Sequence, residues 1–305
     1  MREKLNLAVI GTGRWGKNII KTLELFSWCS VAYTANHNYH TLLKKEDIDA
    51  VLIATPAETH MRVALPFIQK RVPVFIEKPF TTNLKDAKRL ARASQKAKTP
   101  IFVGHIHLYN PAYHAVKKCL KQIGKIRFVT CEGANYGPFR GDVSALWDWA
   151  PHDISVVLDL LDSMPKMVQA WGVSVARPKT TLYDVVYAKL SFSHGVSAFI
   201  FSSYVFPEKR KRITIVGDKG SIVFDDTASR KVTLYKKIKN KLVVSYPQYD
   251  AMLSLTNELK EFLSVVRWKN KFRTDVNEGV SVVRVLDAAE KSIKKGGSSI
   301  KITGR

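Results

Sequence analysis

Short apolar runs alternate with amphipathic stretches through the first hundred or so residues. The apolar runs lie at residues 5–10, 30–35, 50–55, 72–76 and 101–104. Between them, apolar side chains recur at helical spacing at residues 17–26, 58–70 and 84–98, the last with Asn83 as its N-cap. This alternation of strands and helices predicts a parallel sheet with helices on both faces.

The pattern changes after about residue 105. Helices are predicted at residues 111–122, 252–267 and 276–294. Strand-like runs crowd the region between them, at residues 126–132, 167–175, 185–192, 196–205, 212–217, 220–225 and 231–236. We therefore predict an α/β chain of two domains. A Rossmann-type parallel sheet occupies residues 1–104, and an α+β domain with a mostly antiparallel, open sheet occupies residues 105–305.

A glycine-rich segment, GTGRWG, lies between the first predicted strand and the first helix. Gly11 permits a tight turn, Gly13 lets a pyrophosphate approach the backbone, and Gly16 allows the helix to pack closely on the strand. Alone, such a segment is also compatible with a structural turn, but the flanking strand and helix favour a dinucleotide site. Its candidate cofactor-binding residues are Gly11, Thr12, Gly13, Arg14, Trp15 and Gly16.

The adenosine end of this predicted site is unusual. An acidic residue that binds the ribose is expected about 20 residues after the glycines. The chain has YTANH there instead, with neither a carboxylate nor an arginine for a 2′-phosphate. We assign Asn36 to cofactor binding and leave NAD and NADP open. Only residues 36–49 separate the second and third strands, which barely allows one crossover, so the first domain is predicted to be shortened.

Two further segments end strands at the same edge of the predicted sheet. ATPAETH at 54–60 contributes Thr55, Pro56 and His60, and EKP at 77–79 contributes Glu77 and Lys78. Ligands bind at this edge in doubly wound sheets, so we assign these residues to the cofactor site. The alternatives are an ordinary turn for the first segment and a surface lysine for the second.

The segment ALWDWAPHDIS at 145–155 provides a candidate base. Pro151 suits the first turn of a helix, which places His152 in that turn. The positive end of the helix disfavours imidazolium, so His152 is expected to be neutral and basic. Asp148, four residues earlier, is placed to orient His152 or its substrate, whereas Asp153 needs no role beyond its favourable interaction with the helix dipole. The alternative is a structural histidine.

Together these residues resemble the Gfo/Idh/MocA oxidoreductases, in which the same four motifs occur in the same order. The motifs are Gly11–Gly16, Ala54–His60, Glu77–Pro79 and Asp148–His152. A narrower resemblance links the chain to UDP-N-acetylglucosamine 3-dehydrogenases and their uronate relatives. It rests on segments 13–18, 145–155 and 212–220. Compared with this family, the chain is shorter by about one strand and helix between residues 36 and 49.

The resemblance implies an NAD(P)-dependent oxidation at carbon 3 of a UDP-N-acetylhexosamine or its uronate. Lys78 is then expected to hold the reacting hydroxyl, and His152 to take its proton, with Asp148 as the third catalytic residue. The implied substrate-binding residues are Lys78, Arg140, Trp147, Asp148, His152 and Arg212. Another sugar or inositol dehydrogenase of the family, or a non-catalytic cofactor-binding protein, remains as an alternative. The resemblance also implies a homo-oligomer, dimer or tetramer.

Composition limits the partners and the compartment. The chain of 305 residues is 46% hydrophobic and has a net charge of +23, spread over both halves. This charge suits an anionic nucleotide sugar or simply makes a lysine-rich surface; without a nucleic-acid motif we expect no nucleic-acid partner. No apolar run approaches the roughly 20 residues of a membrane span. The start runs directly into a strand, and the three dispersed cysteines fit neither a disulfide framework nor a zinc site. We therefore expect a cytoplasmic protein without a metal.

Overall fold

The computed structural model describes residues 4–178, 180, 182–239, 241–270 and 272–303. Two features noted in the sequence fall outside the described residues: the first three residues, for which no leader was predicted, and Asn240 in a lysine-rich run. The chain divides into two compact units. The first combines residues 1–106 with 252–283, and the second combines residues 107–251 with 284–305. The sequence predicted a domain boundary after residue 104, which assigns residues 252–283 to the second domain. In the structure these residues belong to the first unit.

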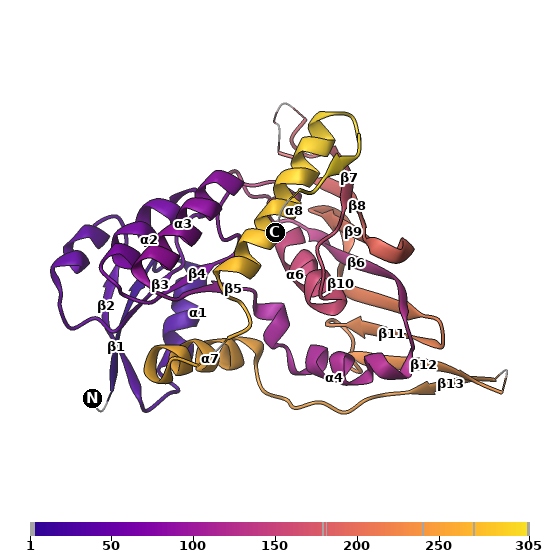
Figure 1. Cartoon of the computed structure of the whole chain (residues 1–305), viewed down its shortest axis with the longest axis horizontal. Coiled ribbons are helices and arrows are strands. Elements are labelled where there is room, and N and C mark those ends of the chain that lie inside the picture. Colours follow the sequence, from indigo (N-terminus) through magenta and orange to yellow (C-terminus); the bar gives the residue numbers. More distant parts are fainter. Residues whose placement is uncertain (1–3, 179, 181, 240, 271, 304–305) are drawn as a thin grey trace. The chain divides into compact units, whose positions relative to one another are not determined.

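Five parallel strands form the sheet of the first unit, in the order β2-β1-β3-β4-β5 (Figure 1). They are β1 (Leu5–Ile10), β2 (Cys29–Ala35), β3 (Ala50–Ile53), β4 (Val74–Glu77) and β5 (Ile101–Gly104). The helices between them are α1 (Arg14–Leu23), α2 (His60–Gln69) and α3 (Leu84–Ala97). Every residue of β3, β4 and β5 is buried, as expected for parallel strands covered on both faces. The predicted parallel Rossmann-type sheet is confirmed.

The connection between β2 and β3 is short. It contains one 3₁₀ helix, Tyr39–Lys44, in which Tyr39 and Leu42 are buried. These two buried side chains attach the connection to the first unit without a full α-helix. The shortened first unit predicted from the sequence is confirmed.

Helix α7 (Ser254–Trp268) returns to the first unit because its apolar face packs there. The ring of Phe262 packs edge-on against Phe75 of β4 and Phe102 of β5, with ring centroids 5.6 and 5.7 Å apart. Phe272, which follows α7, stacks on Phe102 at 5.4 Å. These long-range aromatic contacts, rather than any local pattern, set the boundary between the units.

The second unit contains a nine-stranded sheet in the order β13-β12-β11-β10-β6-β9-β8-β7-β14. Strands β6 and β9 pair in parallel, and the other described pairs are antiparallel. The strands are β6 (Ile126–Tyr136), β7 (Met167–Val173), β8 (Val185–Ser191), β9 (Ser197–Ser203), β10 (Val205–Gly217), β11 (Gly220–Asp225), β12 (Val232–Ile238), β13 (Lys241–Ser245) and β14 (Ile300–Lys301). The predicted, mostly antiparallel sheet is confirmed, although β13 and β14 were not predicted.

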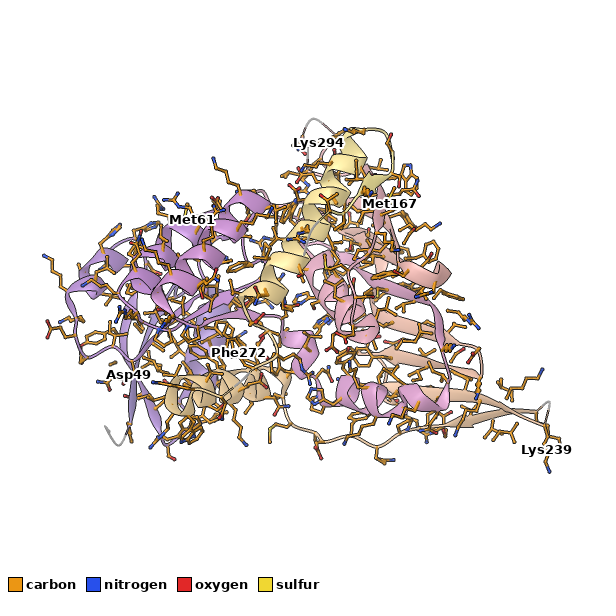
Figure 2. All side chains as sticks on the ribbon, in the orientation of Figure 1. Asp49, Met61, Met167, Lys239, Phe272 and Lys294 are labelled. Carbon is orange, nitrogen blue, oxygen red and sulfur yellow. The ribbon has the colours of Figure 1, made fainter. Side chains whose placement is uncertain are left out.

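Helices cover one face of this sheet. They include α4 (Pro111–Cys119), α5 (Ala145–Asp148) and α6 (Ala150–Leu161). Helix α8 (Val276–Lys294) begins in the first unit and ends in the second. Strands β12 and β13 form a ribbon that extends beyond the rest of the sheet, with Lys239 near its tip (Figure 2).

Two sequence expectations concern the chain as a whole. Cys29, Cys119 and Cys131 are buried thiols that form no disulfide. Among the helices in the described part of the chain, none combines the length and apolar character needed to cross a membrane.

Candidate active site

The glycine turn after β1 is fixed by close backbone contacts. Gly11 has φ +95°, and a Cβ there would lie 2.5 Å from the carbonyl oxygen of Ala54. A Cβ at Gly16 would lie 1.8 Å from the carbonyl oxygen of Gly11. A Cβ at Gly13 would meet no protein atom within 4 Å. Gly11 and Gly16 are therefore required by the fold, whereas Gly13 leaves open space at the start of α1, where a pyrophosphate fits.

Asn36 lies directly after β2 and is tied to this turn. Its side-chain oxygen accepts hydrogen bonds from the backbone N–H of Thr12 at 2.9 Å and from the Thr12 hydroxyl at 3.1 Å. The end of β2 is where the ribose-binding acid is expected. A neutral amide thus occupies that place, which fits a dinucleotide site without a charged selector between NAD and NADP.

Glu77 is buried at the end of β4 but accepts two hydrogen bonds. The indole N–H of Trp15 donates to one carboxylate oxygen, and the backbone N–H of Lys78 donates to the other at 3.2 Å. Burial raises the pKa of Glu77 from about 4.5 to about 7, against the opposing effects of the Trp15 hydrogen bond and the Lys78 charge. Burial, and then the charge of Glu77, raise the pKa of the fully buried Glu258 on α7 well above its usual value.

Glu77 thus links the start of α1 to Lys78. The Lys78 side chain is half-buried, and the peptide bond to Pro79 is cis. Because its own carboxylate is bonded to Trp15, Glu77 holds the backbone at Lys78 close to the glycine turn. Trp15 and Glu77, which the sequence assigned to cofactor binding, therefore contact each other.

His60 joins the two turns at this edge of the sheet. It is 1% exposed, with Nε2 2.9 Å from the carbonyl oxygen of Thr55 and Nδ1 3.0 Å from that of Pro79. Burial lowers the pKa of His60, so the ring is neutral and donates to one of these oxygens. Its side chain supports the turns at Thr55 and Pro79 from within the unit rather than facing outward from the sheet edge.

In the second unit, α6 begins at Ala150, and Pro151 and His152 lie in its first turn. His152 is half-buried, and its ring stacks on that of His107 with centroids 4.2 Å apart and 17° between the ring planes. This stacking fixes the orientation of the imidazole. His107 was not predicted from the sequence, since nothing local distinguishes it from a loop residue.

Asp148 is held by two partners other than His152. Its carboxylate accepts hydrogen bonds from Arg140 at 3.2 Å and from the hydroxyl of Tyr204 at 2.8 Å. Arg140 also donates to Asp142, at 2.6 and 3.0 Å. Burial, and then the charge of Asp148, raise the pKa of Tyr204 further above its usual value, so the hydroxyl stays a donor. The structure brings Arg140 and Asp148 together, and Tyr204 completes a group that the sequence did not reveal.

Trp147 and Arg212, two predicted substrate residues, have different surroundings in the structure. Trp147 is buried, and its indole N–H donates to Glu290 of α8 at 2.9 Å, so it anchors α5 within the unit. Arg212 is exposed and pairs across the sheet with Glu132 and Asp225. Its neighbour Lys211 instead lines a small cavity together with His152. Because side chains alternate along a strand, Arg212 faces away from that cavity.

Lys78 belongs to the first unit, and Asp148 and His152 belong to the second. Within the second unit, hydrogen bonds position the side chain of Asp148 and a ring contact positions that of His152, whereas in the first unit Glu77 bonds to the backbone of Lys78. Among the described residues, no group of three or more His, Cys, Asp or Glu side chains has an arrangement suited to a metal ion.

Comparison with known proteins agrees with this arrangement. Residues 23–105 match an oxidoreductase family with an NAD-binding Rossmann fold, GFO_IDH_MocA, and residues 113–223 match the GFO/IDH/MocA C-terminal domain. A protein of known crystal structure from Magnetospirillum magnetotacticum MS-1 is 32% identical. Its TM-score is 0.85, and the alignment covers 94% of this chain and 99% of that one. The first unit is therefore an NAD-binding Rossmann domain.

Two characterised relatives differ in what they act on. The UDP-N-acetylglucosamine 3-dehydrogenase of Acidithiobacillus ferrooxidans is 31% identical over 170 residues, which cover 55% of this chain and 53% of that enzyme. The inositol 2-dehydrogenase of Rhizobium meliloti is 23% identical over 268 residues, which cover 81% of this chain and 79% of that enzyme. The chain thus aligns with only about half the length of its sugar-nucleotide relative.

Proposed function

The chain belongs to the Gfo/Idh/MocA oxidoreductase family, and from this premise we propose that it oxidises carbon 3 of a UDP-N-acetylhexosamine or its uronate. When bound, NAD accepts the hydride that leaves this carbon. The 31% identity to a UDP-N-acetylglucosamine 3-dehydrogenase and the net charge of +23 support an anionic sugar nucleotide.

In this proposal, Lys78 and His152 act on the same hydroxyl. The Lys78 ammonium holds the hydroxyl oxygen and favours the negative charge that develops on it. His152 takes the hydroxyl proton. Asp148, held by Arg140 and Tyr204, orients the sugar near His152.

The observation that carries catalysis, rather than cofactor binding alone, is the placement of His152. It lies in the first turn of α6 with its ring stacked on His107. The positive end of a helix disfavours imidazolium, so this position suits a base. A protein that only binds a cofactor needs neither an oriented base nor a lysine at the end of β4.

An inositol or other sugar dehydrogenase of the same family is the alternative. The alignment with inositol 2-dehydrogenase covers 81% of this chain, more than the alignment with the sugar-nucleotide enzyme. The two readings differ in one respect: only the first requires partners for a pyrophosphate. Arg140 is our candidate for this contact or for a uronate carboxylate, although in the structure it is bonded to Asp142 and Asp148.

A substrate panel tests the proposal. Purified protein with NAD or NADP is mixed with UDP-N-acetylglucosamine, UDP-N-acetylgalactosamine, their uronates, myo-inositol and free hexoses. Formation of reduced nicotinamide is then followed by absorbance. We expect turnover with a UDP-N-acetylhexosamine or its uronate. Turnover with inositol or free hexoses alone would select the alternative, and cofactor binding without any turnover would reduce the protein to a binder.

We also propose that the chain is a homo-oligomer, dimer or tetramer. The sheet of the second unit exposes Trp171, Tyr187 and Phe199 on the neighbouring strands β7, β8 and β9. Each of these rings is 44–56% exposed, and contiguous exposed aromatic residues are typical of protein interfaces. Light scattering after size-exclusion chromatography should give more than one chain mass. The variant Tyr187→Lys should shift the protein toward monomer.

A further inference from the structure

Asp153 is a buried carboxyl group with an incompletely satisfied oxygen. It lies beside His152 in the first turn of α6 and is 5% exposed. Among the described residues, no hydrogen-bonding group reaches its Oδ2 atom. A Cβ added to Gly133 of β6 would lie 3.1 Å from Oδ2, so the strand leaves just enough room for this carboxyl. An oxygen buried in this way is costly unless it has a use or a water partner.

A small cavity lies next to Asp153. Its lining includes Asp153, His152, His107 and Lys211, and its volume is about 10 Å³. A polar cavity of about 10–15 Å³ holds one water molecule. The Nδ1 atom of His152 is also buried. The surface of the cavity is mostly apolar, but its lining residues supply these two buried polar atoms, and its volume suffices for one water that bridges the imidazole and the carboxyl.

The groups around Asp153 set its charge. Burial raises the pKa of Asp153 to about 8, and the ammonium of Lys211 opposes this effect. On β6, burial and then the charges of Asp153 and Glu132 raise the pKa of the Cys131 thiol well above its usual value, so Cys131 stays neutral. The carboxylate of Glu132 is bonded to Arg210 at 2.9 Å. His152 and His107 complete the titratable groups that line the cavity.

We propose that Asp153 is the proton acceptor behind His152. Through one water in the cavity, it receives the proton that His152 takes from the substrate hydroxyl. This inference rests on the proposed function, because it assigns the next step of the same reaction.

The proton balance is simple. The imidazolium of His152 loses one N–H proton to the bridging water, which gives a proton to Oδ2 of Asp153. A cation and an anion thereby become a neutral imidazole and a neutral carboxyl, so no charge is left buried. The carboxyl then loses its proton to solvent before the next turnover. Because Asp153 has a higher pKa than an ordinary histidine, about 6.5, the transfer runs downhill when Asp153 starts ionised.

The pH dependence of turnover tests this step. With a pKa of about 8, roughly a tenth of Asp153 is ionised at pH 7 and about nine tenths at pH 9. The rate of oxidation should therefore rise about tenfold between these pH values where proton release limits turnover. Asp153→Asn, which is nearly isosteric and removes a buried acid, should fold and lose this rise. Asp162→Asn at the exposed end of the same helix is the matched control and should keep it.

A second variant tests the electrostatic surroundings of Asp153. The Lys211 ammonium lowers the pKa of Asp153, so Lys211→Gln should move the rise in rate to higher pH. Lys209→Gln, on an exposed part of the same strand, should not move it. A rise that persists unchanged in Asp153→Asn, or that stays in place in Lys211→Gln, would overturn the assignment.

Carboxyl ¹³C NMR of aspartate-labelled protein separates this inference from the proposed function. One resonance should titrate with a midpoint near pH 8, be absent from Asp153→Asn and move upward in Lys211→Gln. If the parental protein oxidises no compound of the panel, the proposed function fails and this titration alone decides the state of Asp153. A midpoint near pH 8 would keep it as a proton acceptor at this cavity, and ionisation complete by pH 5 would overturn the inference.

Discussion

The surroundings of Lys78 and of His152 use buried carboxyl groups in different ways. Beside Lys78, both oxygens of Glu77 accept hydrogen bonds, and burial raises the pKa of Glu258 well above its usual value. Beside His152, Asp148 is fully engaged by Arg140 and Tyr204, but Asp153 retains an oxygen without a partner among the described residues and titrates near pH 8. Both Glu77 and Asp153 have pKa values raised toward neutrality by burial, but the hydrogen bonds of Glu77 fix geometry, whereas Asp153 keeps one oxygen for a proton-transfer partner.

The largest effect is expected where backbone geometry alone builds the cofactor site. Gly13→Val should abolish NAD binding while the protein keeps near-parental stability, because its Cβ meets only open space. Gly11→Val should instead lower the free energy of unfolding by on the order of 2–4 kcal/mol, since φ is +95° and Ala54 is too close. Calorimetric titration and thermal unfolding distinguish the two. Equal loss of stability in both variants would contradict the assignment of Gly13 to cofactor binding and of Gly11 to the fold.

Removing either proposed reacting group should lower turnover without affecting cofactor affinity. Lys78→Ala and His152→Ala should each reduce kcat by on the order of a hundredfold or more. Lys85→Ala and His194→Ala, both at exposed positions, serve as controls. Steady-state kinetics and NAD titration measure the effects. Near-parental turnover in either test variant would remove that residue from the mechanism.

Loss of a single donor to Glu77 should give a stability change that depends on pH. The folded protein holds the Glu77 proton more tightly than the unfolded chain, so this group makes stability fall as pH rises from about 4.5 to about 7. Trp15→Phe removes the indole donor and raises the pKa further. The free energy of unfolding of this variant should be lower than that of the parent by about 1–3 kcal/mol at pH 8, and by less at pH 5.

Thermal unfolding at the two pH values measures this difference. Trp28→Phe is the control, because the Trp28 ring packs on the aromatic rings of Phe26 and Trp268. Its effect should be the same at both pH values. A Trp15→Phe loss that does not change with pH would show that the indole acts only through packing.

The smallest effect is expected at Arg140, which is partly exposed and shared between Asp142 and Asp148. Arg140→Ala should raise KM for a UDP-sugar severalfold and lower kcat less, as expected when uniform binding is lost. NAD affinity should not change. Because one charged contact is gone, added salt should weaken substrate binding less in the variant than in the parent. An unchanged KM with equal salt sensitivity would restrict Arg140 to its bonds with the two aspartates.

The sequence predicted best what short-range patterns determine. The glycine turn, the five strands of the first unit and the Asn83 cap, whose side chain accepts from the backbone N–H of Asp86 at 2.9 Å, all depend on neighbouring residues. The return of α7 to the first unit depends on Phe262 meeting Phe75 and Phe102, which no local pattern encodes.

The same limit applies to the candidate site. The sequence suggested Arg212, but Lys211 lines the cavity; choosing between them requires the register of β10, because adjacent residues of a strand face opposite sides. Tyr204 and His107 reach Asp148 and His152 from distant positions in the chain, so only the folded unit reveals them. Asp153 was recognised as a first-turn residue, but its burial against Gly133 could not be seen from its neighbours.

The central claim is that hydride leaves carbon 3 of a UDP-N-acetylhexosamine or its uronate. The most direct measurement uses UDP-N-acetylglucosamine, or the best substrate of the panel, labelled with deuterium at carbon 3. We predict that the deuterium appears on the reduced nicotinamide, detected by mass spectrometry, and that turnover slows when hydride transfer limits the rate. Reduced nicotinamide without deuterium would show that another carbon is oxidised and would contradict the account.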